Sequence, residues 1–146
     1  QNRIPAGKLK NVGTSAAVLS ELVKRLIEHL GQWCIEKVIL SKQPDFIEKN
    51  QIILDADKVG NIVLRYWKAG DRFSPRGING SKKLARVMRD LHISAGERRI
   101  WPLVADENHI YWIAFLRGSN YGLPDKNTKK YLLITLKKEN REDEES

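Results

Sequence analysis

The strongest constraint on the fold is the order in which the spacing of apolar residues changes along the chain. Residues 19–30 place apolar side chains every three or four positions, which is the spacing of an amphipathic helix. Short segments rich in β-branched and aromatic residues follow, then two helical patterns, then further short segments of strand character. Strands around a central helix pair, without regular strand–helix alternation, predict an α+β domain.

Six segments have the composition and the flanking turn residues of strands. They are residues 33–40, 51–54, 61–67, 103–105, 109–115 and 131–136. Between the third and the fourth, Ser81 is expected to cap a helix. The buried stripe of this helix would be Leu84, Val87, Met88 and Leu91. Ser94 and Glu97 have the spacing of a capping box, so a second, short helix should begin there and end before Pro102.

Residues 68–80 are dense in glycine, proline and other turn-forming residues. A loop of this length inside a domain is usually either functional or disordered. Phe73 and Ile78 give the segment apolar side chains to bury. The sequence therefore predicts an ordered loop.

The charge of the chain favours a polyanionic partner. Lys and Arg number 26 and Asp and Glu number 18, which gives a formal net charge of +8. Five of the acids and one Arg lie in residues 139–146, a tail that we expect to be disordered, so the remainder has 25 basic and 13 acidic residues and a charge of +12. Such a charge is typical of nucleic-acid binding. The alternative is a basic surface that serves only solubility.

Several classes of site find no support in the sequence. His29, His92, His109 and Cys34 have no close metal-ligand spacing. No phosphate-binding Walker loop, dinucleotide-binding glycine motif or nucleophile elbow is present, so an independent enzyme is the remotest hypothesis.

The sequence also bears on location. The single cysteine fits a reducing compartment, and the longest apolar stretch, 110–116, is too short for a membrane span. A cytoplasmic protein without membrane contact is expected. The chain begins with Gln1 instead of Met, which suggests a processed or excised fragment, and residues 1–13 have the composition of a linker or arm.

The feature that most favours a binding role is a run of cations after the loop. On the expected helix, Lys82, Arg86 and Arg89 would follow i, i+4, i+7 spacing and form one basic stripe. Lys82 and Lys83 would stand in the first turn, where the helix dipole disfavours cations unless an anion such as phosphate is bound. Further cations that could extend this patch are Arg72, Arg98, Arg99 and Arg117. The alternative is a solvated basic helix face.

The aromatic side chains allow two interpretations. The residues concerned are Trp67, Phe73, Trp101, Tyr111 and Trp112. They could stack on unpaired bases, but aromatic residues in strands more often belong to the core. Contacts with the backbone of structured RNA are therefore favoured over base reading.

Three segments together form a long ordered pattern. Residues 64–84 read Leu-Arg-Tyr-Trp-x-x-Gly-Asp-Arg-Phe-x-Pro-x-Gly-x-x-Gly-Ser-Lys-Lys-Leu, residues 97–104 read Glu-Arg-Arg-Ile-Trp-Pro-Leu-Val, and residues 110–117 contain Ile-Tyr-Trp-Ile and Leu-Arg. With residues 54–58 before them, these segments resemble the C-terminal domain of tRNA(Ile)-lysidine synthetases. Phe115 departs from the pattern, because glycine is common in the family at this position.

The resemblance implies a layered β/β/α fold, similar to part of the phenylalanyl-tRNA synthetase β chain. It implies a parent enzyme that uses ATP and Mg to ligate lysine to the wobble cytosine of tRNA(Ile). The adenylating domain of that enzyme carries a Ser-Gly-Gly-x-Asp-Ser loop, which is absent here, so no cofactor and no catalytic residue are expected in this chain. The implied partners are tRNA(Ile), the N-terminal adenylating domain and, in a homodimeric parent enzyme, a second copy.

We therefore expect residues 14–138 to form one domain that docks the body of the tRNA near its acceptor stem, with the family-matching core at 54–117. The cations named above are its expected tRNA-binding residues. The alternative is a protein-interaction module that packs on a catalytic domain or partner subunit through the first helix and the apolar hairpin.

Overall fold

The fold is built around two strands that are buried on both faces, β6 (Leu103–Ala105) and β7 (Ile110–Ile113). The structure is a computed structural model that describes residues 33–138. β6 and β7 pair in antiparallel fashion, and β3 (Val63–Arg65) and β8 (Arg117–Gly118) flank them in the order β3-β6-β7-β8. Because side chains alternate between the faces of a strand, a sheet of this kind requires an apolar layer on each side.

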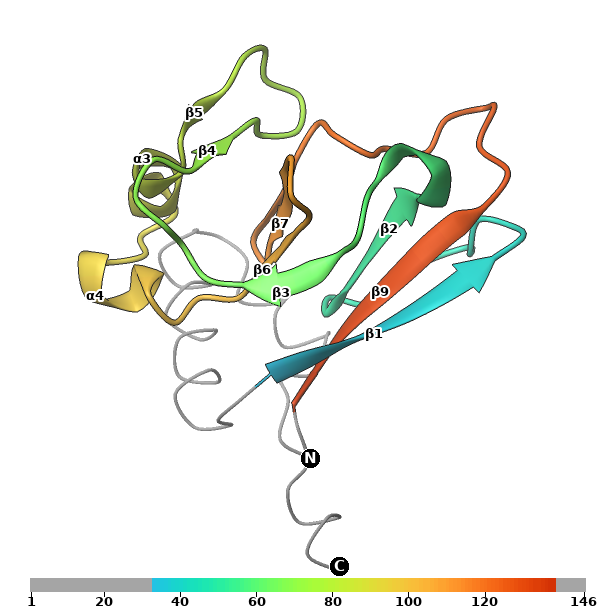
Figure 1. Cartoon of the computed structure of the whole chain (residues 1–146), viewed down its shortest axis with the longest axis horizontal. Helices are drawn as coiled ribbons and strands as arrows, with labels where there is room; N and C mark the ends of the chain where they lie inside the picture. Colours follow the sequence, from blue (N-terminus) through green and yellow to red (C-terminus); the bar gives the residue numbers. More distant parts are fainter. Residues whose placement is uncertain (1–32, 139–146) are drawn as a thin grey trace, which may run out of the picture.

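A second sheet supplies one of these layers. It consists of β1 (Trp33–Leu40), β9 (Tyr131–Lys138) and β2 (Gln51–Asp55), with β9 in the middle and both pairs antiparallel. The strands of this sheet lie side by side on one side of the molecule (Figure 1). Buried residues alternate along β2 and β9, and the buried set packs against the central sheet. These residues are Ile52, Leu54, Leu132, Ile134 and Leu136.

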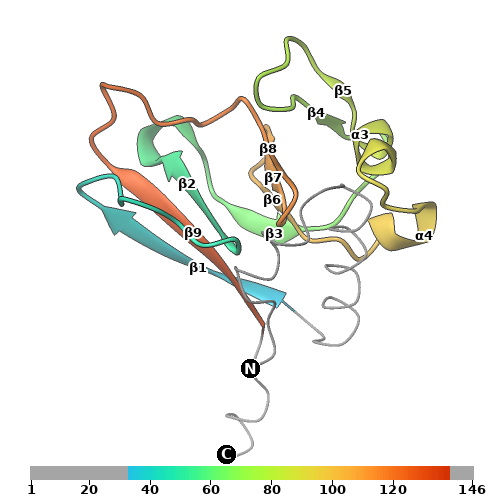
Figure 2. The same cartoon turned by 180° about the vertical axis from the view of Figure 1, so that it is seen from behind.

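The helices supply the other layer. α3 (Leu84–Asp90) and α4 (Ala95–Arg98) lie on the side of the central sheet away from β1, β9 and β2, as the view from behind also shows (Figure 2). Leu84 and Met88 of α3 are fully buried against Leu103 and Ile113. Truncating a side chain buried in this way to alanine costs roughly 2–5 kcal/mol. The predicted α+β class with β/β/α layers is confirmed.

Most of the predicted strands are present. The segments predicted at 33–40, 51–54, 103–105 and 131–136 correspond to β1, β2, β6 and β9, and a short 3-10 helix (Ala56–Lys58) follows β2. The segments predicted at 61–67 and 109–115 contain the shorter strands β3 and β7. The predicted arm (1–13), amphipathic helix (19–30) and acidic tail (139–146) lie outside the described residues.

The predicted start of the central helix is wrong. Lys82–Lys83 is a strand, β5, which pairs with β4 (Arg72–Phe73), and α3 begins only at Leu84. Lys83 occupies the N-cap position without a side-chain cap, and the Leu84 backbone N–H donates to the Asp71 carbonyl at 2.8 Å. Pairing between the two ends of the loop therefore overrides the capping signal of Ser81.

The capping box predicted for α4 is confirmed. The Ser94 hydroxyl accepts from the Glu97 backbone N–H at 3.3 Å, and the Glu97 carboxylate accepts from the Ser94 backbone N–H at 2.9 Å. This helix is a single turn of four residues. Both bonds are local, which is why the sequence could predict them.

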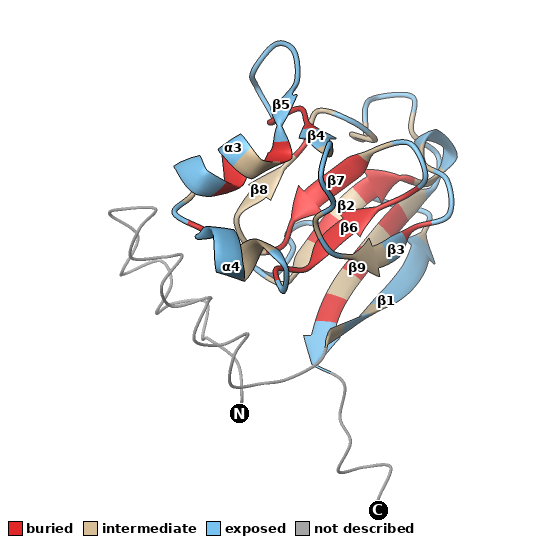
Figure 3. Ribbon diagram, turned by 60° about the vertical axis from the view of Figure 1, so that its left-hand side comes forward, coloured by how far each residue is buried: buried red, intermediate tan, exposed pale blue. Residues whose placement is uncertain are grey.

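Four of the five aromatic residues singled out in the sequence belong to the core. Phe73, Trp101, Tyr111 and Trp112 are buried, and the Trp101 indole N–H donates to the Ala114 carbonyl at 3.1 Å. Base stacking by these four rings is therefore excluded. Figure 3 shows the same burial along the central strands.

Phe115 adopts a backbone conformation that glycine accepts more easily. Its φ is +69°, in the left-handed region, where a residue without a Cβ atom is under less strain. The phenylalanine ring lies edge-on to Trp33, with 5.7 Å between the ring centroids, and it also contacts Trp112. The ring of Phe115 thus packs between the two sheets, although its backbone adopts an unfavourable conformation.

Asp106 organises the turn between β6 and β7. Its carboxylate accepts hydrogen bonds from the backbone N–H groups of Gly60, Asn108 and His109 and from the Tyr111 hydroxyl, at 2.7–2.8 Å. Burial alone would raise the pKa of Asp106, but these hydrogen bonds outweigh it and lower the pKa to about 2. Burial and the bond to Asp106 raise the pKa of Tyr111, so the hydroxyl keeps the proton that it donates.

The low pKa of Asp106 predicts a specific loss of stability in acid. The pKa of an unfolded aspartate is about 3.9, so its ionisation contributes roughly 2 kcal/mol to the free energy of unfolding above pH 5. This contribution is lost as the pH falls from about 4 to about 2, because the unfolded aspartate then takes up a proton while the folded one remains ionised. Asp106→Asn should lower the free energy of unfolding by roughly 2 kcal/mol at pH 7 and by much less at pH 2.5.

Denaturant unfolding monitored by tryptophan fluorescence measures this difference. Glu107→Gln is the matched control, since Glu107 is the exposed neighbour of Asp106 and should give the same small effect at both pH values. A constant gap between wild type and Asp106→Asn from pH 7 to pH 2.5 would contradict the assignment.

Candidate nucleic-acid interface

Residues 72–83 form an arm that projects beside α3, with β4 and β5 at its base and a loop at its tip (Figure 1). Arg72 and Lys83 are register partners across the two strands, so two cations face each other directly. Like charges at such positions repel. The Arg72 guanidinium is held by the Ser81 hydroxyl and the Ser81 carbonyl, at 2.9 and 3.0 Å.

α3 adds further cations to the arm. Arg86 and Arg89 are exposed one turn apart, on the side of the helix away from the buried Val87 and Met88. The predicted helical stripe is corrected here, because Lys82 lies on β5 and only two of the three residues are on the helix. β5 runs directly into α3, so the four cations still follow one another on a strand and a helix that contact each other.

Among the described residues, no negative side chain forms an ion pair with these cations. Within residues 33–138, the basic partners in ion pairs are Lys58, Arg65 and Lys137. None of the eight predicted binding residues is therefore paired with a described carboxylate. Uncompensated cations of this density create a positive potential that attracts anions.

Arg98 differs from the other predicted cations because it is packed against the protein. Its guanidinium carbon lies 5.0 Å from the centroid of the Trp67 ring, in a cation–π arrangement. Its Nε is buried without a hydrogen-bond partner. Arg99, the next residue, is exposed. α4 and α3 contact each other, so Arg99 follows a helix that packs beside the one carrying Arg86 and Arg89.

Arg117 of β8 contacts Arg76 of the arm, an arginine that the sequence did not single out. The Arg117 Nη2 donates to the Arg76 carbonyl at 3.0 Å, and the Arg76 Nε donates to the Ser119 carbonyl at 3.3 Å. Burial and the positive charge of Arg117 lower the pKa of Arg76. The only sequence signal for Arg76 was its place in a loop of functional length, because the residues that it meets are about 40 positions away.

The loop at the tip of the arm is ordered by Asn120. The Asn120 side-chain amide donates to the carbonyls of Pro75 and Ile78 at 2.9 and 2.8 Å, and its oxygen accepts from the Gly77 backbone N–H at 2.9 Å. The predicted order is present, but its expected cause is only half right. Phe73 is buried, whereas Ile78 remains 40% exposed.

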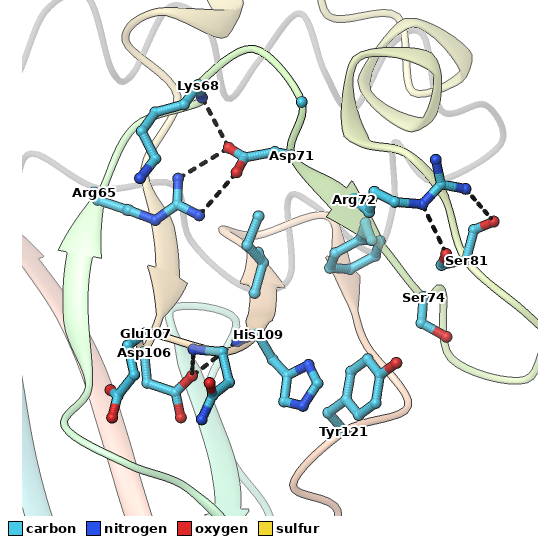
Figure 4. A pocket seen from close by; sticks show the side chains of 14 residues that line it. Arg65, Lys68, Asp71, Arg72, Ser74, Ser81, Asp106, Glu107, His109 and Tyr121 are labelled. Carbon is cyan, nitrogen blue, oxygen red and sulfur yellow. Dashed lines mark hydrogen bonds and ion pairs between the residues drawn. The ribbon is translucent and has the colours of Figure 1, made fainter.

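A polar pocket of about 450 Å³ lies between the base of the arm and the β6–β7 turn (Figure 4). On one side, Asp71 accepts two hydrogen bonds from the Arg65 guanidinium at 2.9 and 3.1 Å. Burial would raise the pKa of Asp71, but the bonds from Arg65 and the Lys68 backbone N–H lower it. On the other side, the His109 and Tyr121 rings stack with 3.7 Å between their centroids.

The pocket does not contain a reactive constellation among these groups. Asp71 and Asp106 are engaged in structural hydrogen bonds, and Arg72 binds Ser81. In the described part of the chain, no group of three His, Cys, Asp or Glu side chains could hold a metal ion. The helices of that part include none long and apolar enough to cross a bilayer.

Comparison with known proteins identifies the family. The sequence profile of the family described as "TilS substrate C-terminal domain" matches residues 62–134, half of the chain. The chain belongs to this family. The match includes the arm, both helices, β8 and β9 up to Ile134.

The curated relatives that the chain matches are much longer than the chain. A tRNA(Ile)-lysidine synthase of Caldanaerobacter subterraneus is 40% identical over 115 residues, which cover 77% of this chain and 25% of that protein. The enzyme of the same name from Clostridium acetobutylicum is 40% identical over 92 residues, covering 62% and 20%. The chain thus spans about a quarter or less of the length of these curated relatives.

A solved structure supports the fold independently. A crystal structure of a TilS C-terminal domain superimposes with a TM-score of 0.62 at 24% identity, over 74% of this chain and 85% of that one. At this identity the likeness concerns the fold alone. The layered arrangement of the described residues is therefore the fold of the family.

The different environments of Arg98 and Arg99 predict different effects of removing each side chain. Arg98→Ala removes the cation–π contact and the packing of its aliphatic stem on Trp67, so the free energy of unfolding should fall by about 1 kcal/mol. Arg99→Ala at the exposed neighbouring position should change it by less than about 0.5 kcal/mol. Urea unfolding at neutral pH measures both, and equal effects would show that Arg98 is as free as Arg99.

Proposed function

We propose that this domain docks the body of tRNA(Ile) for a tRNA(Ile)-lysidine synthase, a cytoplasmic ligase that joins lysine to the wobble cytosine with ATP. The observation that carries the proposal is the set of cations on the arm and α3 that lack carboxylate partners among the described residues. Family membership and the name of the relatives supply the identity of the RNA. The proposed unit comprises residues 14–138.

The contribution to the reaction is one of position. A domain that holds the tRNA body fixes the orientation of the reacting base relative to a catalytic site elsewhere, and correct orientation lowers the entropic part of the barrier. Lys82, Lys83, Arg86 and Arg89 would contact phosphates, which give affinity without reading sequence. Structured RNA is commonly held in this way, through its backbone and shape.

The residues that the structure describes do not form a site that fits ATP or Mg. The Ser-Gly-Gly-x-Asp-Ser loop is absent from the sequence, and residues 33–138 include no cluster of potential metal ligands. No step of the ligation is therefore assigned to a side chain of this domain.

Salt dependence tests the proposal directly. If about four phosphates are contacted, the dissociation constant of the chain for tRNA(Ile) should rise roughly with the third power of the salt concentration, because bound counterions are released on binding. Fluorescence anisotropy with labelled tRNA at salt concentrations from about 50 to about 200 mM measures how the dissociation constant changes with salt. Absence of binding at low salt, or a flat response, would overturn the proposal.

A charge reversal locates the interface. Lys83→Glu with Arg86→Glu should weaken tRNA binding at least tenfold, by an estimate of about 1.4 kcal/mol from two lost phosphate contacts. Lys42→Glu with Lys49→Glu is the matched control, because both lysines are exposed in the β1–β2 loop on the opposite sheet. Equal losses in the two double variants would show that only net charge matters.

A second candidate function is docking on another protein surface, and one specific feature favours it. Phe46 is 75% exposed in the β1–β2 loop, and Ile39 of the edge strand β1 is 56% exposed. Exposed apolar groups rimmed by polar residues are typical of protein interfaces. The partner would be the adenylating domain or a second copy of the chain.

Analytical ultracentrifugation of the chain distinguishes the two candidates. Docking through this surface to a second copy predicts association that depends on concentration, is reduced by Phe46→Ser, and is unaffected by added tRNA. Lys49→Ser in the same loop is the control. A monomer at all concentrations would remove the homodimer, and retained tRNA binding by Phe46→Ser would separate this surface from the RNA interface.

A further inference from the structure

We propose that Arg76 and Arg117 form a clamp for one backbone phosphate of RNA, separate from the cations of β5 and α3. The clamp rests on the proposed tRNA-docking function and adds to it a defined site, with Arg76 as a residue that the sequence did not single out. Its ligand class is a phosphodiester, recognised by the two guanidinium groups together.

The geometry holds the two guanidinium groups close together on neighbouring segments. Arg117 reaches over to the Arg76 carbonyl at 3.0 Å, while the Arg76 side chain lies against Gly118, the residue next to Arg117. Burial, and after it the positive charge of Arg117, lowers the pKa of Arg76. Two like charges are thus held together in the folded state, although they repel each other.

The contacts that hold this pair leave its charge uncompensated. The two side chains donate to backbone carbonyls, those of Arg76 and Ser119, and no described carboxylate forms an ion pair with either arginine. A guanidinium has five N–H donors, and each of these two uses one on the protein. The remaining donors suit the oxygens of a phosphate, which arginine binds with its planar fork.

The surrounding bonds make the pair a preformed site. The Arg76 backbone N–H donates to the Gly118 carbonyl at 3.0 Å, and Pro75 forms a bridge with Ser119. Asn120 fixes the remainder of the loop through Gly77 and Ile78. A site ordered before binding loses less entropy when its ligand arrives.

Gly118 leaves the space that the Arg76 side chain occupies. A Cβ atom at this position would lie 2.7 Å from the Arg76 Nη2 and 3.0 Å from its Cζ. The φ of Gly118 is not positive, so its backbone conformation is open to residues other than glycine. An alanine would therefore displace the guanidinium while the strand and every charge of the chain remain.

Charge-conserving substitutions in the full chain test the clamp. Arg76→Lys and Arg117→Lys keep the net charge but lose the planar fork, so each should weaken binding of a tRNA(Ile) transcript by about fivefold or more. Lys42→Arg, the reverse exchange on the opposite sheet, is the control and should stay within about twofold. Thermal unfolding of each variant verifies that the fold is retained.

Gly118→Ala provides the second, independent test. Displacement of Arg76 should weaken tRNA binding by a similar factor, with little change in stability because the clash involves the end of a flexible side chain. Gly96→Ala is the matched control, since a Cβ there meets nothing within 4 Å. Combining Gly118→Ala with Arg76→Lys should add little to either substitution alone, because both act on the same contact.

The outcomes separate the clamp from the function on which it rests. If the wild-type chain binds tRNA, and Lys83→Glu with Arg86→Glu weakens it, but Arg76→Lys, Arg117→Lys and Gly118→Ala all bind like wild type, the clamp is overturned and tRNA docking stands. If the wild-type chain binds no tRNA at low salt, both fall. Saturable binding of inorganic phosphate that these substitutions abolish while tRNA affinity is unchanged would assign the site to a free anion and overturn the RNA clamp.

Discussion

The architecture depends on the burial of both faces of the β6–β7 hairpin. Its strands carry apolar side chains on both sides, so the hairpin is stable only when a layer covers each face. The β1-β9-β2 sheet covers one face and α3 with α4 covers the other. Because α3 is fixed in this way by Leu84 and Met88, the strand and loop that lead into it are fixed as well, and their cations acquire a defined position.

The apolar core and the cations of the proposed interface therefore lie in different parts of the molecule. The two apolar clusters lie on either side of the central sheet, whereas the unpaired cations lie on the arm, on the outer side of α3 and on β8. Repulsion among these cations is tolerated because the layers, and not the arm, supply most of the buried apolar area. An RNA backbone would relieve this repulsion at no cost to the core.

The candidate site could be predicted from sequence only in part. The cations at 82–89 are neighbours along the chain, so their proximity was visible, but their secondary structure was not. Ser81 has the character of a helix cap, yet pairing of Lys82–Lys83 with Arg72–Phe73 delays the helix to Leu84. Strand pairing with a segment about ten residues earlier prevents the helix from starting at the cap. A local sequence pattern does not reveal such pairing.

By itself the sequence determined the apolar periodicities, the α+β class and the excess of positive charge, because each of these is a property of local spacing or of composition. The resemblance to the family rested on the long ordered pattern between residues 54 and 117. Only the tertiary structure decided that Arg98 packs on Trp67, that Asn120 holds the arm, and that Arg76 meets Arg117. The last two contacts join residues about 40 positions apart. The physical reason is that packing of the layers brings β8 beside the arm, and this proximity has no counterpart in the spacing along the chain.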